Sequence, residues 1–200
     1  MTVMEAPEKT QREMAGPPVI NNFSIAVATK NGSGSATSNT VLLRSLFKMG
    51  IPVSGKNLFP SNIQGLPTWF TIRLNQDGYH ARRERAEITV IMNPVTALED
   101  LAKAETGGVV LYPDDLNLPT TREDVTFYPM PVKKLSRESE APANLRSYVA
   151  NFVYVGVLAH LLGIETADIE SALHFNFKGK PKPIKLNLDV FVAARRWAEE

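Results

Sequence analysis

A segment rich in glycine and serine, residues 31–37, has the residue types and spacing that could hold a phosphate. Its sequence, Asn-Gly-Ser-Gly-Ser-Ala-Thr, follows an apolar run and precedes an amphipathic one, so it joins an expected strand to an expected helix. Small residues let the backbone approach a ligand there, and free N–H groups of the first helical turn can bind an anion. The same residues also fit a ligand-free turn in which Ser35 caps the helix.

A second polar segment, residues 54–67, carries Ser-Gly-Lys-Asn and then Ser-Asn-Ile-Gln-Gly-Leu-Pro. Ligands of open α/β sheets bind beyond the carboxyl ends of strands, so two polar loops at neighbouring strand ends would form a pocket. The alternative is that Gly55 and Gly65 only make turns. The candidate binding residues from both segments are Gly32, Ser33, Gly34, Ser35, Lys56, Asn57, Ser61, Gln64 and Gly65.

The elements around these segments predict an α/β fold. Strands are expected at residues 22–28, 51–54, 69–74, 79–82, 86–92, 107–112 and 126–131, and helices at 36–49, 94–103, 144–162, 166–173 and 188–198. The helix at 144–162 is expected to be the longest, and residues 177–185 to form an extended basic link. This alternation predicts a Rossmann-like open, mostly parallel sheet with helices on both faces. The pair Asp77-Gly78 predicts an antiparallel hairpin of residues 69–74 with 79–82.

Composition predicts one globular domain without a strong electrostatic field. The chain has 200 residues, 44% of them hydrophobic, and 22 Lys and Arg against 21 Asp and Glu give a net charge of +1. We expect a single domain at residues 21–200 and a disordered polar lead at residues 1–20, which contains several prolines and charges. A charge this close to zero favours neither nucleic acid nor a membrane as a partner.

Cysteine is absent, which excludes disulfides, a thiolate nucleophile and a cysteine-ligated zinc or iron–sulfur site in this chain. The first residues do not form a charged and then apolar signal, so a cytoplasmic location is expected. The most apolar stretch, residues 148–164, is shorter than the about 20 residues that span a bilayer. It is better explained as a buried helix.

Other polar residues give little support for catalysis. His80, His160 and His174 lack metal-ligand spacing, so no metal site is expected, and His160 is expected to be a hydrogen-bonded core residue. Asp114-Asp115 follows a proline and predicts a turn. The serines have no recognisable histidine partner. No catalytic residue is therefore assigned.

The amino-acid sequence of residues 31–83 is more specific than any of these patterns. From the glycine loop through Ser61-Asn-Ile-Gln-Gly to the strand that contains Arg73, it resembles the gamma domain of 2-oxoacid:ferredoxin (acceptor) oxidoreductases. The resemblance is strongest to 2-oxoglutarate-type enzymes, in which this domain begins a longer alpha subunit. The segment Lys185-Leu-Asn-Leu-Asp-Val-Phe is similar to the last element of that domain, so the resemblance covers about residues 22–195.

The resemblance implies a role within a larger enzyme. Enzymes of that family decarboxylate a 2-oxoacid on thiamine diphosphate, pass electrons through iron–sulfur clusters to ferredoxin and form an acyl-CoA. The gamma domain would pack on thiamine-binding alpha- or beta-type subunits or domains, meet ferredoxin only indirectly and help close over coenzyme A. Thiamine diphosphate and the clusters would lie on those partners, so the isolated chain is expected to be inactive.

Coenzyme A suits the loops already described. Its phosphates need backbone N–H groups and a cation, so Ser33, Gly34, Ser35 and Lys56 are the expected contacts. Two basic clusters compete for this role, although each is more typical of a solvated face or an intersubunit salt-bridge surface: Arg82, Arg83 and Arg85, and Lys178, Lys180, Lys182 and Lys185.

Two other functions stay open. A stand-alone dinucleotide-binding module could use the same G-x-G-x-x-T loop, but Thr37 replaces the third glycine of the fingerprint, and no acidic residue clearly ends the second strand. Alternatively, a purely structural subunit would use its glycine loops only for packing on a partner.

Overall fold

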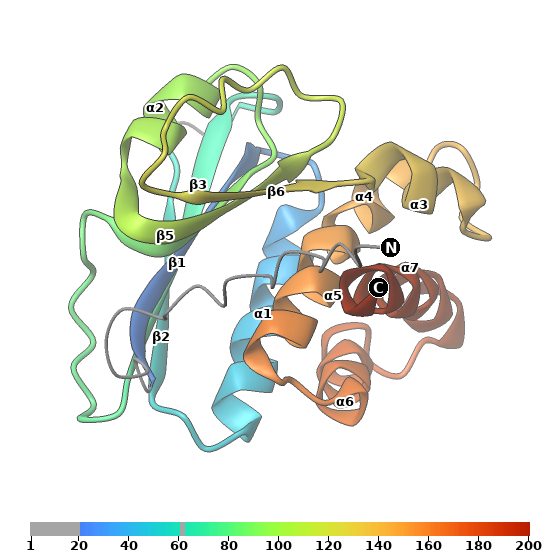
Figure 1. Cartoon of the computed structure of the whole chain (residues 1–200). Helices are drawn as coiled ribbons and strands as arrows, with labels where there is room; N and C mark the ends of the chain where they lie inside the picture. The colour runs from blue at the N-terminus through green and yellow to red at the C-terminus, as the bar shows by residue number, and fades with distance from the viewer. Residues whose placement is uncertain (1–20, 61–62) are drawn as a thin grey trace, which may run out of the picture.

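A six-stranded sheet is the centre of the computed structural model, which describes residues 21–60 and 63–200 (Figure 1). Its strands are β1 (Asn22–Lys30), β2 (Val53–Leu58), β3 (Pro67–Asn75), β4 (Ala86–Ile91), β5 (Ala104–Pro113) and β6 (Thr126–Met130). The helices are α1 (Ser35–Lys48), α2 (Ala97–Ala102), α3 (Val132–Glu138), α4 (Arg146–Val149), α5 (Asn151–Leu162), α6 (Thr166–Asn176) and α7 (Pro181–Glu199).

The strand order is β2-β3-β1-β4-β5-β6. The neighbours β1, β4, β5 and β6 pair in parallel, and β3 is antiparallel to both β1 and β2. Strand β2 therefore runs in the same direction as β1, and the two strands end at the same edge of the sheet. The predicted α/β class with a mostly parallel sheet is confirmed.

The antiparallel hairpin is formed by a different pair of strands from the predicted one. Residues 79–82 form no strand, and the partner of β3 is β2, in the register Val53 to Leu74 through Leu58 to Trp69. Both edges of β3 are already taken, one by β2 and the other by β1. After a turn at Gly78, the chain consequently leaves the sheet. The predicted pairing of residues 69–74 with 79–82 was wrong.

Helices cover both faces of the sheet, but unequally (Figure 1). On one face, α1, α5, α6 and α7 enclose the main core, to which β1 contributes Ile25 and Val27. On the other face, α2 and the connection before β6 enclose a smaller core around Leu101, Tyr112 and Leu118. Alternating side chains of the strands supply both cores, because neighbours along a strand point to opposite faces.

The helices that follow β6 depart most from the predicted elements. Helix α7 is the longest of the described helices and begins at Pro181, so residues 181–185 are helical and not an extended link. Prolines are tolerated there because the first turn of a helix needs no intrahelical N–H bond. The helix predicted at 144–162 is divided into α4 and α5 at Ala150, and the short helix α3 was not predicted.

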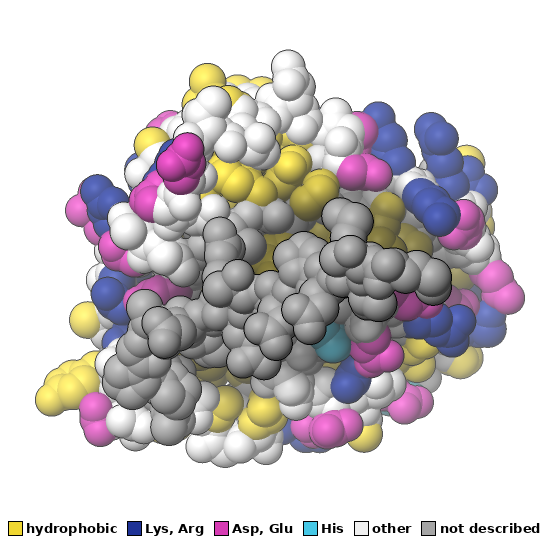
Figure 2. Space-filling model, in the orientation of Figure 1, with side chains coloured by type: hydrophobic (Ala, Val, Ile, Leu, Met, Phe, Trp, Pro, Cys, Tyr) yellow, Lys and Arg dark blue, Asp and Glu magenta, His cyan; other side chains and the backbone are white. Residues whose placement is uncertain are grey.

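Helix α5 is buried on almost all sides and packs closely against α7. A Cβ atom at Gly156 would lie 2.5 Å from the carbonyl oxygen of Phe191, so only glycine permits this helix crossing. No described helix is both long and apolar enough to cross a membrane. Figure 2 shows acidic and basic side chains mixed on the visible surface, in agreement with the net charge of +1.

Candidate functional site

The glycine loop lies where the chain changes direction across the sheet. From β1 the chain passes through α1 on one face to β2, and from β4 it passes through α2 on the other face to β5. Because β1 and β4 are neighbours, their carboxyl ends border a topological switch point. Open α/β sheets bind ligands in the crevice at this position.

Two glycines give the loop its shape. Gly32 has a φ of 82° and Gly34 a φ of 83°, in the left-handed region that favours glycine. Gly34 is the N-cap residue of α1 and provides no side-chain cap, so the alternative in which Ser35 caps the helix does not hold. The Ser35 hydroxyl is buried and accepts a hydrogen bond of 2.8 Å from Thr29. The first-turn N–H groups of α1 therefore have no side-chain acceptor at the N-cap.

The two predicted loops meet at this edge of the sheet. The Asn31 amide N–H donates to the Leu66 carbonyl at 2.8 Å, and the Gly65 N–H donates to the Asn31 carbonyl at 2.9 Å. A Cβ atom on Gly32 would lie 2.8 Å from Cγ of Gln64, so Gln64 packs on the glycine loop. The prediction that the loops lie at neighbouring strand ends agrees with these contacts.

A pocket of about 350 Å³ opens between the loop, β2 and β3. Of the predicted residues, it is lined by Gly32, Gly34, Ser35 and Asn57. Its other lining residues are Thr29, Asn31, Ala36, Asn39, Phe59, Thr68, Trp69, Phe70 and Tyr148. The pocket thus combines the N-terminus of α1, amide side chains and aromatic rings.

Lys56 does not reach this pocket. In the register of β2 with β3, Asn57 is opposite Phe70 and Lys56 is opposite Thr71. Adjacent residues of a strand point to opposite faces, so Asn57 faces the α1 side and Lys56 faces the other side. Lys56 lines a separate hollow with Arg73 and Arg82. The prediction had assumed a loop at residues 54–57, which instead belong to β2.

The remaining predicted residues have other positions. Ser33 has a buried hydroxyl without a hydrogen-bond partner among the described residues, and its N–H donates to the Lys30 carbonyl at 3.2 Å. Gln64 and Gly65 support the loop and do not line the pocket. Ser61 lies outside the described residues.

Helix α5 supports the glycine loop through side-chain hydrogen bonds. The Asn151 side chain, which is 3% exposed, donates to the Ser33 carbonyl at 2.6 Å and to the Tyr148 carbonyl at 3.2 Å. The Tyr154 hydroxyl donates to Asn39 at 2.8 Å, and burial raises the pKa of this phenol. Sequence reasoning missed these supports, although a polar Asn151 inside an apolar run is a usable signal.

The basic clusters are partly neutralised by acidic neighbours. Lys185 pairs with Glu140 and Asp189, and the hydrogen bond to Glu140 raises the pKa of its ammonium group. Arg83 pairs with Glu87. These contacts favour the interpretation as salt-bridged surfaces for Lys185 and Arg83.

Two of the other predictions can be compared with the fold. His160 is exposed near the end of α5, so the expectation of a core histidine was wrong. Asp114 and Asp115 form the predicted turn, and Asp115 pairs with Lys133 at 2.6 Å. Within residues 21–60 and 63–200, no three His, Asp or Glu side chains are grouped as metal ligands. Iron–sulfur clusters held by cysteine do not fit a chain with no cysteine.

The fold and the loop define an α/β domain with a glycine loop at the switch point of its sheet. The chain belongs to the pyruvate ferredoxin/flavodoxin oxidoreductase family, which matches residues 24–197. The resemblance to the gamma domain of 2-oxoacid:ferredoxin oxidoreductases is thereby confirmed.

A relative from Aeropyrum pernix agrees with this assignment. The alpha subunit of 2-oxoacid:ferredoxin oxidoreductase 2 from Aeropyrum pernix is 20% identical over 90% of this chain and 34% of its own length. The chain thus spans about one third of that relative.

Three solved structures share the fold. A 2-oxoglutarate:ferredoxin oxidoreductase from Magnetococcus marinus, with 2-oxoglutarate, coenzyme A and succinyl-CoA bound, has a TM-score of 0.79 and 20% identity over 90% of this chain and 32% of its own. The gamma subunit of a keto/oxoacid ferredoxin oxidoreductase from Geobacter sulfurreducens has a TM-score of 0.69 and 16% identity over 88% of this chain and 98% of its own. The pyruvate oxidoreductase subunit PORC of Thermotoga maritima has a TM-score of 0.68 and 15% identity over 88% of this chain and 97% of its own.

Proposed function

We propose that this chain, as one domain over residues 21–200, is the gamma-type component of a thiamine-dependent 2-oxoacid:ferredoxin oxidoreductase. The assembled enzyme would convert a 2-oxoacid, coenzyme A and oxidised ferredoxin to acyl-CoA, carbon dioxide and reduced ferredoxin. This chain would supply assembly contacts and part of the coenzyme A site. The observation that carries the proposal is the family match over residues 24–197 of a domain whose glycine loop borders an open pocket.

Coenzyme A fits the chemistry of the pocket. The first-turn N–H groups of α1, next to Gly34 and Ser35, would hold a phosphate, because a helix N-terminus attracts anions. Asn57 adds an amide donor from β2. Phe59 and Tyr148, which are 53% and 46% exposed, offer apolar surfaces at the pocket on which an adenine ring could pack.

The electron-transfer apparatus would lie on partner subunits or domains. Without cysteine, this chain cannot provide thiolates for an iron–sulfur cluster. The glycine loop also gives little support for a dinucleotide module, since β2, the second strand, is followed by Phe59 and not by a carboxylate that could bind a ribose. The fold shared with a 2-oxoglutarate:ferredoxin oxidoreductase supports 2-oxoglutarate as the 2-oxoacid to test first.

The proposal is tested by activity before and after assembly. The pure chain, supplied with thiamine diphosphate, coenzyme A and 2-oxoglutarate, should not reduce a viologen dye. The chain co-expressed with its thiamine-binding partner should do so. Robust dye reduction by the pure chain would reject the proposal, and so would a failure of this chain to co-purify with any thiamine-binding subunit.

A residue-level test separates coenzyme A from the 2-oxoacid. In the assembled enzyme, Asn57→Ala should raise the KM for coenzyme A roughly tenfold, the effect of one lost hydrogen bond to a charged group, and leave the KM for the 2-oxoacid unchanged. Gln76→Ala removes an exposed amide elsewhere and is the matched control. Equal changes in both KM values would count against this pocket as a coenzyme A site.

A further inference from the structure

A second hollow, of about 260 Å³, lies on the face of the sheet opposite α1. Cross-strand pairing places Lys56 opposite Thr71 and Ser54 opposite Arg73 on this face. The segment after β3 closes the hollow with Arg82. Lys56, Thr71 and Arg73 of the hollow point away from Asn57 and Phe70 of the glycine-loop pocket, because neighbours along β2 and β3 point to opposite faces of the sheet.

The cations of this hollow have no acidic partner. No ion pair among the described residues includes Lys56, Arg73 or Arg82, and no carboxylate lines the hollow. Arg73 is only 8% exposed and donates to neutral acceptors, the carbonyls of Phe23 (3.0 Å) and Leu74 and the side-chain oxygen of Asn22. A buried guanidinium without a counter-ion is costly, so an anion bound beside it would be strongly favoured.

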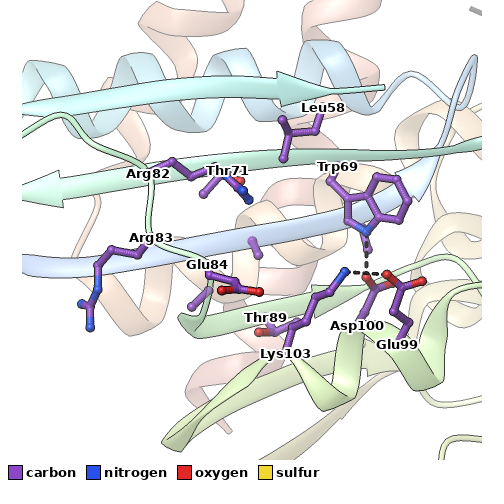
Figure 3. A pocket seen from close by; sticks show the side chains of 13 residues that line it. Leu58, Trp69, Thr71, Arg82, Arg83, Glu84, Thr89, Glu99, Asp100 and Lys103 are labelled. Carbon is purple, nitrogen blue, oxygen red and sulfur yellow. Dashed lines mark hydrogen bonds and ion pairs between the residues drawn. The ribbon is translucent and has the colours of Figure 1, made fainter. Parts of the chain in front are cut away.

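An apolar recess of about 250 Å³ continues from the hollow along the sheet. Thr71 and Arg82 line both spaces, and Figure 3 shows them at one end of the recess with Trp69 at the other. The indole N–H of Trp69 donates to the Asp100 carboxylate at 2.7 Å, which fixes the ring.

Small apolar side chains and charged side chains together line the remainder of the recess. Ala26, Ala28 and Leu58 provide small and apolar side chains. Thr89, which is 3% exposed, also lines the recess, and its buried hydroxyl has no hydrogen-bond partner among the described residues. Three carboxylates, Glu84, Glu99 and Asp100, line the recess, where Glu99 pairs with Lys103. Glu87, on the same face of β4, pairs with Arg83 and accepts a hydrogen bond from the Ser24 N–H, and none of these four carboxylates lines the hollow.

We propose that the hollow and the recess form a second ligand site, which binds an organic phosphate monoester. The phosphate would lie between Lys56, Arg73 and Arg82, since guanidinium and ammonium groups both bind phosphate oxygens strongly. Its apolar or aromatic body would lie in the recess beside Trp69. The phosphate position is separate from the coenzyme A site, because Lys56 and Arg73 lie on the face of the sheet opposite Asn57, whereas Trp69 lines both the recess and the glycine-loop pocket.

Trp69 is a built-in reporter for the test. The chain has two tryptophans, so Trp197→Phe leaves Trp69 as the only one. Phenyl phosphate, titrated into this full-length variant, should change the fluorescence of Trp69 and saturate. Lys56→Gln and Arg82→Gln should each weaken the binding roughly tenfold or more, the effect of one lost charge-assisted hydrogen bond. Both side chains are exposed, and circular dichroism verifies that each variant is folded.

Controls define the result that overturns the proposal. Lys182→Gln removes an exposed positive charge from α7 and should leave the affinity unchanged. Inorganic phosphate should bind roughly tenfold more weakly than phenyl phosphate, because it buries no ring. Absence of saturable binding, equal affinity for both phosphates, or the same loss in Lys182→Gln would overturn the proposal. Loss of binding in Asn57→Ala would do so too, since Asn57 lines the glycine-loop pocket and the ligand would then be assigned there.

Discussion

Asn151→Ala is the substitution with the largest expected effect on the glycine loop from outside it. The Asn151 amide donates to the carbonyls of Ser33 (2.6 Å) and Tyr148 (3.2 Å), and the residue is 3% exposed. Removing it takes away two hydrogen bonds and leaves the Ser33 carbonyl without this donor. A net hydrogen bond contributes about 1 kcal/mol, and a buried unsatisfied acceptor costs about 1–3 kcal/mol. We therefore expect a loss of about 2–3 kcal/mol in the free energy of unfolding.

Urea unfolding of the isolated chain measures this loss. Gln76→Ala, which removes an exposed amide on the turn after β3, is the control and should change the free energy of unfolding by less than about 0.5 kcal/mol. In the assembled enzyme, Asn151→Ala should also raise the KM for coenzyme A more than that for the 2-oxoacid, because Asn151 positions the loop. If Asn151→Ala were no more destabilising than Gln76→Ala, the argument that α5 holds the loop would be refuted.

Two further predictions concern stability. Gly156→Ala would place a Cβ atom 2.5 Å from the Phe191 carbonyl oxygen and should lower the free energy of unfolding by about 3 kcal/mol. In the control Gly50→Ala, the Cβ atom meets no atom within 4 Å, and only backbone strain of about 1 kcal/mol is expected. Equal losses of stability in thermal unfolding would contradict the close crossing of α5 and α7. Burial raises the pKa of the Asp100 carboxyl, so the folded state binds the proton first as the pH falls. As the pH falls from the folded to the unfolded pKa of this carboxyl, the wild type should therefore gain stability relative to Asp100→Asn, and the gain is complete below the unfolded pKa. A loss of relative stability over this pH range in urea titrations would contradict the raised pKa.

Sequence patterns predicted the glycine loop correctly because the residues that determine its conformation are adjacent in the chain. An apolar run, small residues with positive φ at Gly32 and Gly34, and an amphipathic run follow one another directly in the chain. The resemblance to the family was equally local, since it rested on the wording of residues 31–83. Neither depended on knowing which strands pair.

Predictions that depended on distant pairing were less accurate. The turn at Asp77-Gly78 exists, but the partner of β3 was decided by β1 and β2, which occupy both of its edges. The same information places Lys56 and Asn57 on different faces of the sheet. As neighbours in a supposed loop they were interchangeable, and only their register in β2 shows that Asn57 alone reaches the pocket.

Hydrogen–deuterium exchange of the assembled enzyme, with and without coenzyme A, tests the central claim most directly. If the pocket binds coenzyme A, its addition should slow exchange in peptides that cover residues 31–37 and 57–60, where the α1 N-terminus and Asn57 line the pocket. Peptides that cover residues 178–185 should be unchanged. Protection confined to residues 178–185, or no protection at the glycine loop under saturating coenzyme A, would contradict the account.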